Sequence, residues 1–410
     1  MTRRCRSCGA EAVEPFLDLG PQPLAGWFPG PGDVPPDPTW PLRPAVCRRC
    51  WLVQLSGSSP DEFEAPDAPL PTGSRTMAAH ARAFVADLAG RGLATPTTTT
   101  LELASHGGHL QPFFAQIGVP TVVLEASPTR AARLAQEGGR VVSVTLGDAP
   151  ADPLVTDFGP AHLLVDHYLL AHLEDPEGAL AAMARLLAPD GWLALEFDHL
   201  LPTIEGRQFD AFRHGHRSYL SLTWLAEALA RQGLVAVEAK PFPVYGGALR
   251  VLARRAGAGD ADVTRSVAAM LEREAAAGLG DVSTFHAFAR DVAEARSATV
   301  AFLNERAGAG RPVAAYGAPA RAVTLLNYYG LGPELLAFTA DASPTKQGRA
   351  IPGVRLPITA PEALRVARPA EVLILTWDIA PEVIAQLEGE GSWGARYLVP
   401  LPRLTEVGVR

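Results

Sequence analysis

The chain has 410 residues, a formal net charge of −8 and 48% apolar residues. A chain of this length exceeds what one hydrophobic core usually serves, so two or three domains are expected. The acidic balance argues against a general nucleic-acid binder, and no apolar run approaches the roughly 20 residues that cross a bilayer. We therefore expect small-molecule partners, without nucleic acid or membrane, for a monomer or a small homo-oligomer.

All four cysteines lie near the N-terminus in two CxxC pairs, Cys5 with Cys8 and Cys47 with Cys50. Two such pairs present four thiolates to one cation, an arrangement that suits structural zinc. A pair of disulfides is the alternative, but disulfides need an oxidising compartment and no signal-peptide pattern precedes Cys5. The sequence thus favours a zinc ribbon in a cytoplasmic protein, with a closed metal site that has no open position for chemistry.

The pattern of apolar residues divides the chain into four parts. Residues 1–70 hold the cysteines and a Pro-rich middle, and we predict a zinc-binding domain there. Short apolar runs alternate with amphipathic segments over residues 71–256 and again over 307–410, which is typical of α/β domains. Residues 257–306 read as long helices, so we predict a helical connector between the two α/β domains.

The first α/β unit carries a candidate nucleotide site. The strand expected over residues 100–103 contains Glu102 and is followed by a glycine turn that ends at Gly108. The next strand, expected over residues 121–124, is followed by Glu125, which is well placed to accept from ribose hydroxyls. The turn is not a GxGxxG motif, so adenosine binding and a plain structural βαβ unit both remain open at this point.

Eight of the ten histidines lie between residues 106 and 216, mostly just past strands expected over residues such as 162–165 and 192–197. Ligands of open α/β sheets bind at the carboxyl ends of the strands. A lone histidine such as His80 or His162 is more often a satisfied polar residue than a catalyst. The segment with His214 and His216 between Arg213 and Arg217 is a stronger candidate for an acid/base centre. An ordinary solvated polar loop is the alternative.

Motifs along the whole chain resemble those of the zinc-containing, S-adenosylmethionine (SAM)-dependent sugar C-methyltransferases that act on TDP-linked 4-keto-deoxysugars in antibiotic pathways. Residues 102–108 resemble the family's E-I-G-S-N-D-G turn, residues 170–173 its L-A-H-V, and residues 196–200 its E-x-P-H-L. The two CxxC pairs match at the head. Tyr316 to Arg321 and Asp341 to Gly348 follow the last domain of the family.

The resemblance implies a fold, cofactors and site residues. The fold is an N-terminal zinc ribbon followed by a central Rossmann-like methyltransferase domain and a second, C-terminal Rossmann-like α/β domain. The cofactors are SAM and structural zinc, and the substrate is a nucleotide sugar. The implied residues are Glu102, Ala104, Ser105, Gly108, Glu125 and Ala126 for SAM; His216, His214, Arg213 and His172 for catalysis; and Tyr219, Tyr245, Arg321 and Lys346 for substrate.

This chain departs from the family at the acceptor site. The hallmark Y-H-E-H-F-S-Y appears as residues 213–219, with Arg213 for the first tyrosine and Gly215 for the glutamate. The later T-H-G-G-S-L-R appears as residues 244–250, with Tyr245 for the histidine. His216 remains as the expected base for enolising a ketone, and Arg213 offers a cation for the enolate oxygen.

Alternatives follow from these departures. Methylation of oxygen or nitrogen needs no enolate and would tolerate the missing tyrosine and glutamate, and a divergent relative could have lost methyl transfer. In the last domain, Arg321 and Lys346 could cradle a pyrophosphate, or the domain could only brace the active site.

Overall fold

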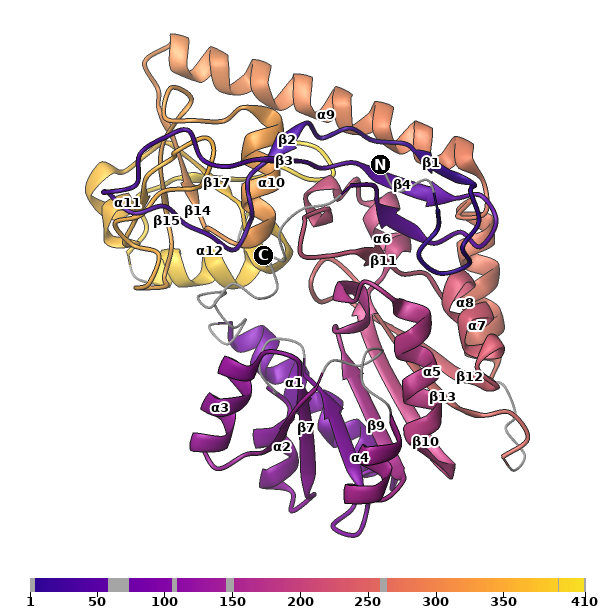
Figure 1. Cartoon of the computed structure of the whole chain (residues 1–410). Helices are drawn as coiled ribbons and strands as arrows, with labels where there is room; N and C mark the ends of the chain where they lie inside the picture. The colour runs from indigo at the N-terminus through magenta and orange to yellow at the C-terminus, as the bar shows by residue number, and fades with distance from the viewer. Residues whose placement is uncertain are drawn as a thin grey trace.

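The computed structural model describes residues 4–57, 74–104, 109–144, 151–258, 264–389 and 391–408, and the side chains of 151 and 152 are left aside. The described strands form a four-stranded, a seven-stranded and a six-stranded sheet, and β2 pairs with β3 in a short ribbon. The three larger sheets occupy different parts of the molecule (Figure 1). Within the described ranges, no helix has the length and apolar character needed to cross a membrane.

The seven-stranded central sheet has the order β12-β13-β10-β9-β6-β7-β8. Strands β10, β9, β6, β7 and β8 are parallel, and β13 runs antiparallel to both β10 and β12. The strand order reverses between β6 and β9, and ligands of open α/β sheets bind at that point, beyond the carboxyl ends of the strands. The strands are β6 (Thr100–Leu103), β7 (Thr121–Glu125), β8 (Arg140–Ser143), β9 (Ala161–His167), β10 (Leu187–Asp198), β12 (Leu234–Phe242) and β13 (Ala248–Arg255).

Burial explains why these segments form strands. Every residue of β6 and β7 is buried, as expected for parallel strands covered on both faces. The strands predicted over residues 100–103, 121–124, 162–165 and 192–197 are all present. The accompanying helices are α1 (Arg75–Gly90), α2 (Gln111–Gln116), α3 (Pro128–Gln136), α4 (Ala151–Phe158), α5 (Pro176–Leu186), α6 (Leu200–Glu205) and α7 (Leu222–Arg231), with short 3-10 turns η2 (Leu170–His172) and η3 (Phe209–Ala211).

The N-terminal sheet has the order β1-β4-β5-β11, with antiparallel pairing throughout. Its last strand, β11, belongs to the segment just after His216 and pairs with β5 through Ser218 and Tyr219. The segment that carries the cysteines therefore holds the strand beside the candidate base. The N-terminal strands are β1 (Val13–Pro15), β2 (Pro21–Gln22), β3 (Trp40–Pro41), β4 (Pro44–Cys47), β5 (Val53–Leu55) and β11 (Ser218–Tyr219).

Two helices, α8 (Arg265–Ala276) and α9 (Val282–Gly308), connect the central and C-terminal sheets. At about 1.5 Å per residue, α9 is roughly 40 Å long, and it runs past the N-terminal strands to the C-terminal sheet (Figure 1). Phe285 and Phe288 of α9 contact Phe16 at ring-centroid distances of 5.1 and 6.2 Å, and Phe288 also contacts Phe212 at 6.1 Å. Phe212 directly precedes Arg213, so this aromatic cluster packs α9, the N-terminal segment and the segment before Arg213 against one another.

The C-terminal sheet has the order β16-β15-β14-β17-β18-β19, parallel except for β19. The strand-turn-helix predicted at residues 313–318 is present. The elements are β14 (Val313–Tyr316), α10 (Ala320–Tyr329), β15 (Leu336–Ala340), β16 (Ile358–Thr359), α11 (Glu362–Ala367), β17 (Glu371–Ile374), η4 (Trp377–Ile379), α12 (Ala380–Gly389), β18 (Arg396–Val399) and β19 (Thr405–Val407).

Candidate active site and zinc centre

The four cysteines converge at one point of the N-terminal region. The Sγ atoms of Cys5 and Cys50 are 3.5 Å apart, those of Cys8 and Cys47 are 3.6 Å apart, and all four lie within 4.8 Å of one another. A tetrahedral zinc with Zn–S bonds of about 2.3 Å requires sulfur–sulfur distances of roughly 3.8 Å. The donor set therefore fits zinc. These distances exceed a disulfide bond of about 2.05 Å, and the thiols are unpaired, so the disulfide alternative is wrong.

The two CxxC knuckles have matching backbone turns. Gly9 N donates to Cys5 O and Trp51 N donates to Cys47 O, each at 2.9 Å, and both donors adopt positive φ angles of 68° and 61°. Such a turn brings the two thiols of each pair to the same side. The local sequence thus builds two equivalent half-sites, which the tertiary fold joins.

The predicted cofactor carboxylates lie at the carboxyl ends of β6 and β7. Glu102 Oε1 accepts from Leu110 N at 3.0 Å, and Glu125 Oε1 accepts from Ser127 N at 2.8 Å and from the Arg130 guanidinium at 3.1 Å. In each carboxylate, Oε2 is buried and has no hydrogen-bond partner within the described ranges. Burial raises the pKa of Glu102 to about 7.

These orphaned oxygens fit the adenosine end of SAM. Ribose hydroxyls donate hydrogen bonds, and buried carboxylate oxygens without a partner are costly unless a ligand or water satisfies them. Ala104 and Ala126 follow the two strands, whereas Ser105 and Gly108 lie outside the described residues. Glu102 thus lies on β6, at the switch point between β6 and β9, and Glu125 lies at the end of the next strand, β7.

The candidate catalytic residues meet at the neighbouring strand ends. Arg213 Nη2 is 2.5 Å from His216 Nε2, and the His172 ring lies 4.4 Å from that of His216, edge to face. His172 Nδ1 is 2.6 Å from Gly215 O, which fixes the loop to η2. His216 is only 4% exposed, so the solvated-loop alternative is wrong. Asp198, the last residue of β10, places Oδ2 at 3.9 Å from His216 Nδ1.

Two tyrosines line the same site in an unusual backbone conformation. Tyr168 follows β9, Tyr245 lies in the turn between β12 and β13, and their φ angles are 69° and 54°. Bulky residues rarely adopt such angles, and strained residues of this kind concentrate at functional sites. Their rings meet at 5.0 Å, and burial together with the nearby carboxylates Glu196 and Asp198 raises the pKa of Tyr168.

A polar network around the buried Glu196 connects β10 to His109, the residue that follows the predicted cofactor turn. Glu196 Oε1 lies 2.5 Å from His80 Nε2 and 3.1 Å from His167 Nε2, and Arg250 Nε donates to Oε2 at 2.8 Å. The His167 ring also contacts His109 at 4.7 Å, and His109 directly follows the cofactor turn. His80 is therefore a satisfied buried residue, as the sequence favours, but one that joins α1 to the strand ends.

Other predicted residues have structural partners. The Tyr219 hydroxyl accepts from Arg213 N at 2.9 Å and donates to Arg213 O at 3.2 Å, which braces the loop. The ring centroids of His214 and of Trp40, in β3, are 6.5 Å apart. The structure thus gives Tyr219 and His214 contacts within the protein, and their roles toward substrate and catalysis stay predictions.

Arg321 reaches from α10 into the central part of the molecule. It donates to Tyr245 O at 2.9 Å and to Asp210 Oδ1 at 2.9 Å, and its Nε is buried without a partner in the described part of the chain. Lys346, by contrast, donates to Ala318 O at 2.9 Å and lies over the Phe28 ring at 5.2 Å. Arg321 thus lies beside Tyr245, a predicted substrate residue, whereas Lys346 contacts the turn after β14.

The turn after β14 does not present free amides to a phosphate. Ala318 N donates to Asp341 Oδ2 at 2.6 Å, and Lys346 Nζ is 3.8 Å from the same oxygen. A carboxylate in this position would repel a pyrophosphate. Of the two alternatives for the last domain, this geometry favours bracing at this turn.

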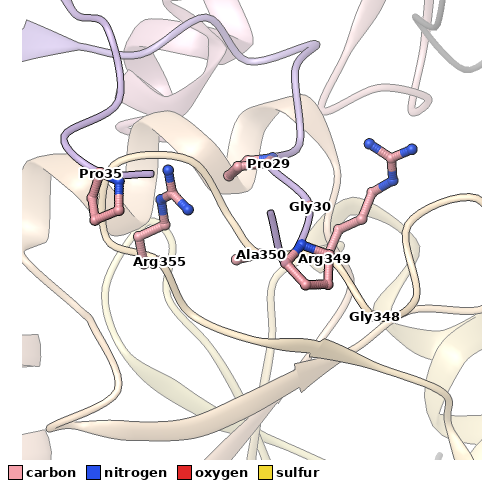
Figure 2. A pocket seen from close by; sticks show the side chains of 8 residues that line it. Pro29, Gly30, Pro35, Gly348, Arg349, Ala350 and Arg355 are labelled. Atoms are coloured by element: carbon pink, nitrogen blue, oxygen red, sulfur yellow. The ribbon is translucent and has the colours of Figure 1, made fainter. Parts of the chain in front are cut away.

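A hollow of about 380 Å³ lies between the N-terminal residues 29–35 and residues 348–355 of the loop that joins β15 to β16 (Figure 2). Two of its lining residues, Arg349 and Arg355, carry guanidinium groups. Both are already engaged: Arg349 donates to Phe28 O at 3.0 Å, and Arg355 is paired with Asp37. The hollow is therefore a junction between two parts of the chain, apart from the cofactor and acceptor sites.

Several residues of the site were not assigned from the sequence. Asp198, Tyr168 and Glu196 all lie at or just past the carboxyl ends of β9 and β10. The rule that ligands bind at such ends could have selected them, since each ionisable residue there is a candidate. The proximity of Asp198 to His216, and of Tyr168 to Glu196, could not be predicted from the local sequence pattern.

Three family models and one relative match most of the chain. A C-methyltransferase C-terminal domain matches residues 243–402, a zinc binding domain matches residues 5–62, and a methyltransferase domain matches residues 74–239. The chain is 31% identical over 401 residues to the C-methyltransferase NovU of Streptomyces niveus, covering 97% of this chain and 95% of NovU.

Solved structures resemble parts of the chain. Magnesium protoporphyrin IX methyltransferase of Synechocystis PCC 6803, with bound S-adenosylhomocysteine, is 17% identical with a TM-score of 0.35, over 44% of this chain and 84% of its own. The glycopeptide N-methyltransferase MtfA, complexed with SAM, is 19% identical with a TM-score of 0.34, over 44% of this chain and 87% of its own. Scores this low carry no argument about function.

Proposed function

Because this chain belongs to the C-methyltransferase family and is a SAM-dependent enzyme with a zinc-binding head, we propose that it methylates the carbon beside a ketone in a nucleotide-linked keto-deoxysugar or a similar enolisable natural-product intermediate. Membership of a carbon-methylating family argues against the alternatives of oxygen or nitrogen methylation and of lost activity. The carbon acceptor requires an enolate, and the site has to supply a base and an oxyanion partner for it.

The observation that carries the proposal is the contact between Arg213 and His216 in a buried site. His216 Nε2 takes the proton from the carbon next to the ketone, and the electron pair of the broken C–H bond moves to the carbonyl oxygen. For this step Arg213, which has several donors, first turns from His216 to the ketone oxygen, which frees Nε2 and places the guanidinium beside the enolate oxygen as it forms. SAM, when bound, supplies an electrophilic methyl group for the enolate carbon.

The other residues position these groups. Tyr219 and His172 hold the loop through Arg213 and Gly215, and Tyr245 with Tyr168 covers the acceptor side. The buried Nε–H of Arg321 is available to a substrate oxygen at the border of the C-terminal sheet. Correct positioning matters because methyl transfer is an in-line displacement.

The test is the exchange of deuterium at the acceptor carbon alongside methyl transfer. In His216→Asn, both rates should fall about 10²-fold, since general-base catalysis contributes that much. SAM affinity, measured by calorimetry, should not change because His216 lies on the acceptor side. A variant that keeps near-normal exchange and turnover would remove His216 from this role.

The acceptor class is tested with paired substrates. A TDP-linked 4-keto-deoxysugar should be methylated, while the corresponding sugar with a hydroxyl in place of the ketone should not, because its C–H bond is not acidified. Methylation of a hydroxyl or an amine in either compound would contradict the proposal.

A further inference from the structure

The Arg213–His216 contact fixes the protonation of the imidazole. A guanidinium has five N–H donors and no acceptor. His216 Nε2, at 2.5 Å from Arg213 Nη2, must therefore be the accepting nitrogen, and the ring proton of the neutral imidazole lies on Nδ1. That nitrogen faces Asp198 Oδ2 at 3.9 Å.

Asp198 has the surroundings of a functional carboxylate. Its Oδ1 is buried and finds no hydrogen-bond partner in the described part of the chain. In the motifs quoted above, a proline occupies the position of Asp198 and a glutamate that of Gly215. One carboxylate is thus absent from the His216 loop and another is present on the adjacent strand end.

We propose that Asp198 is a positioning residue for His216: its Oδ2 accepts the Nδ1–H, holds Nε2 toward the acceptor carbon and stabilises the imidazolium that forms when the proton is taken. The distance of 3.9 Å between Asp198 Oδ2 and His216 Nδ1 has to shorten to hydrogen-bond length. Such shortening is expected, because catalytic hydrogen bonds are often long in the absence of substrate. The proposal rests on the proposed function, in which His216 is the base.

The surrounding charges allow Asp198 to act as an anion at neutral pH. Burial raises its pKa to about 6, and the cations Arg213 and Arg321 oppose that rise. The groups that face it from the neighbouring elements are Arg213, His216, Arg321, Asp378, Glu196, Tyr168 and Tyr245.

The experiment combines kinetics with an NMR titration of His216 in the full-length, zinc-loaded protein. Signals of His216 are assigned by comparison with His216→Asn. In Asp198→Asn, the titration midpoint of His216 should move to lower pH by about one unit, because an opposite charge at this distance favours the imidazolium. The kcat for methyl transfer should fall about 10²-fold, with SAM affinity unchanged.

Two further variants serve as controls. Asp198→Glu keeps the carboxylate, so the titration midpoint of His216 should stay near its wild-type value and most of kcat should remain. Asp190→Asn removes an exposed carboxylate from the same strand and should change neither. If Asp198→Asn does not fold, Asp198→Ser gives the same comparison.

The outcomes separate the inference from the proposed function. An unchanged His216 midpoint in Asp198→Asn overturns the role of Asp198, whatever the activity. Suppose instead that the His216 midpoint differs between the wild type and Asp198→Asn, but the wild type neither exchanges deuterium nor methylates keto acceptors. That result overturns the proposed function and leaves the Asp198–His216 interaction supported.

Discussion

At the residue scale, the site gathers groups whose chemistry depends on their neighbours. Arg213 would be an ordinary surface cation in a loop, but its contact with His216 Nε2 determines that the ring proton of the neutral imidazole lies on Nδ1. Asp198 and Glu196, two residues apart on β10, have opposite environments. Burial raises the pKa of Asp198, whereas the bonds that Glu196 receives from His167 and His80 hold its pKa well below the usual range despite burial.

The raised pKa of Asp198 predicts an acid limb in the pH profile of kcat. The carboxylate has to be ionised to support His216, so activity should fall as the pH drops through about 6. Methyl transfer measured from pH 5 to 8 should show this limb. In Asp198→Asn, at its lower activity, only the limb of His216 itself should remain, shifted to lower pH. If the acid limb persisted unchanged in Asp198→Asn, the limb would belong to another group.

Arg213 gives a second prediction at this scale. Arg213→Lys keeps a positive charge but has a single nitrogen, which cannot serve both His216 and an enolate oxygen through a planar fork. We expect kcat to fall about 10-fold to 100-fold, less than for Arg213→Ala. Single-turnover methyl transfer measures this, and equal losses in the two variants would argue against a role for the charge.

At the element scale, the zinc-binding segment supports the catalytic loop. Strand β5 pairs with β11, Leu55 N donates to Arg217 O at 3.1 Å, and Ser7 accepts from Trp224 Nε1 at 2.9 Å. The N-terminal sheet is small, so its order depends on the metal. We therefore expect zinc to affect catalysis through the position of His216, since four thiolate ligands leave no place for substrate on the metal.

Removal of zinc should consequently weaken catalysis more than cofactor binding. Treatment with a chelator, or Cys5→Ser, should lower methyl transfer by at least 10-fold, because a displacement of about 1 Å in the reacting groups already costs that much. SAM affinity from calorimetry should change little, since Glu102 and Glu125 lie on strands of the central sheet, whereas β11 belongs to the N-terminal sheet. Restored activity on adding zinc back would confirm the link, and equal loss of SAM binding would contradict it.

At the scale of the whole molecule, Arg321 joins the C-terminal sheet to the acceptor site. Its partners Asp210 and Tyr245 belong to η3 and to the β12–β13 turn, and Trp377 lies beneath its guanidinium at 4.6 Å. Asp210 also accepts from Trp377 Nε1 at 2.8 Å. The C-terminal domain thus contacts the side of the site that carries Tyr245 and Asp210.

Arg321→Ala should leave Asp210 buried without its cation. Breaking one partner of a buried ion pair costs about 3 kcal/mol, so thermal unfolding should occur at a lower temperature. The kcat/KM for the acceptor should fall as well, because Tyr245 loses a support. Calorimetry and steady-state kinetics check both effects, and Arg349→Ala, at the junction hollow, controls for loss of any C-terminal arginine.

The features that depend on local pattern could be predicted from the amino-acid sequence. The CxxC pairs, the buried strands of the central sheet and the glutamates at their ends follow from spacing, hydrophobic runs and the rule for strand ends in open sheets. His216 as the base came from motif resemblance. Only the packing of the sheets brings Asp198 to His216, Tyr168 to Tyr245 and Arg321 to Asp210. The same holds for the pairing of the zinc-binding segment with β11, the strand after His216, and for Asp341 in the turn after β14. These contacts join residues far apart in sequence, and their distances depend on how the sheets pack.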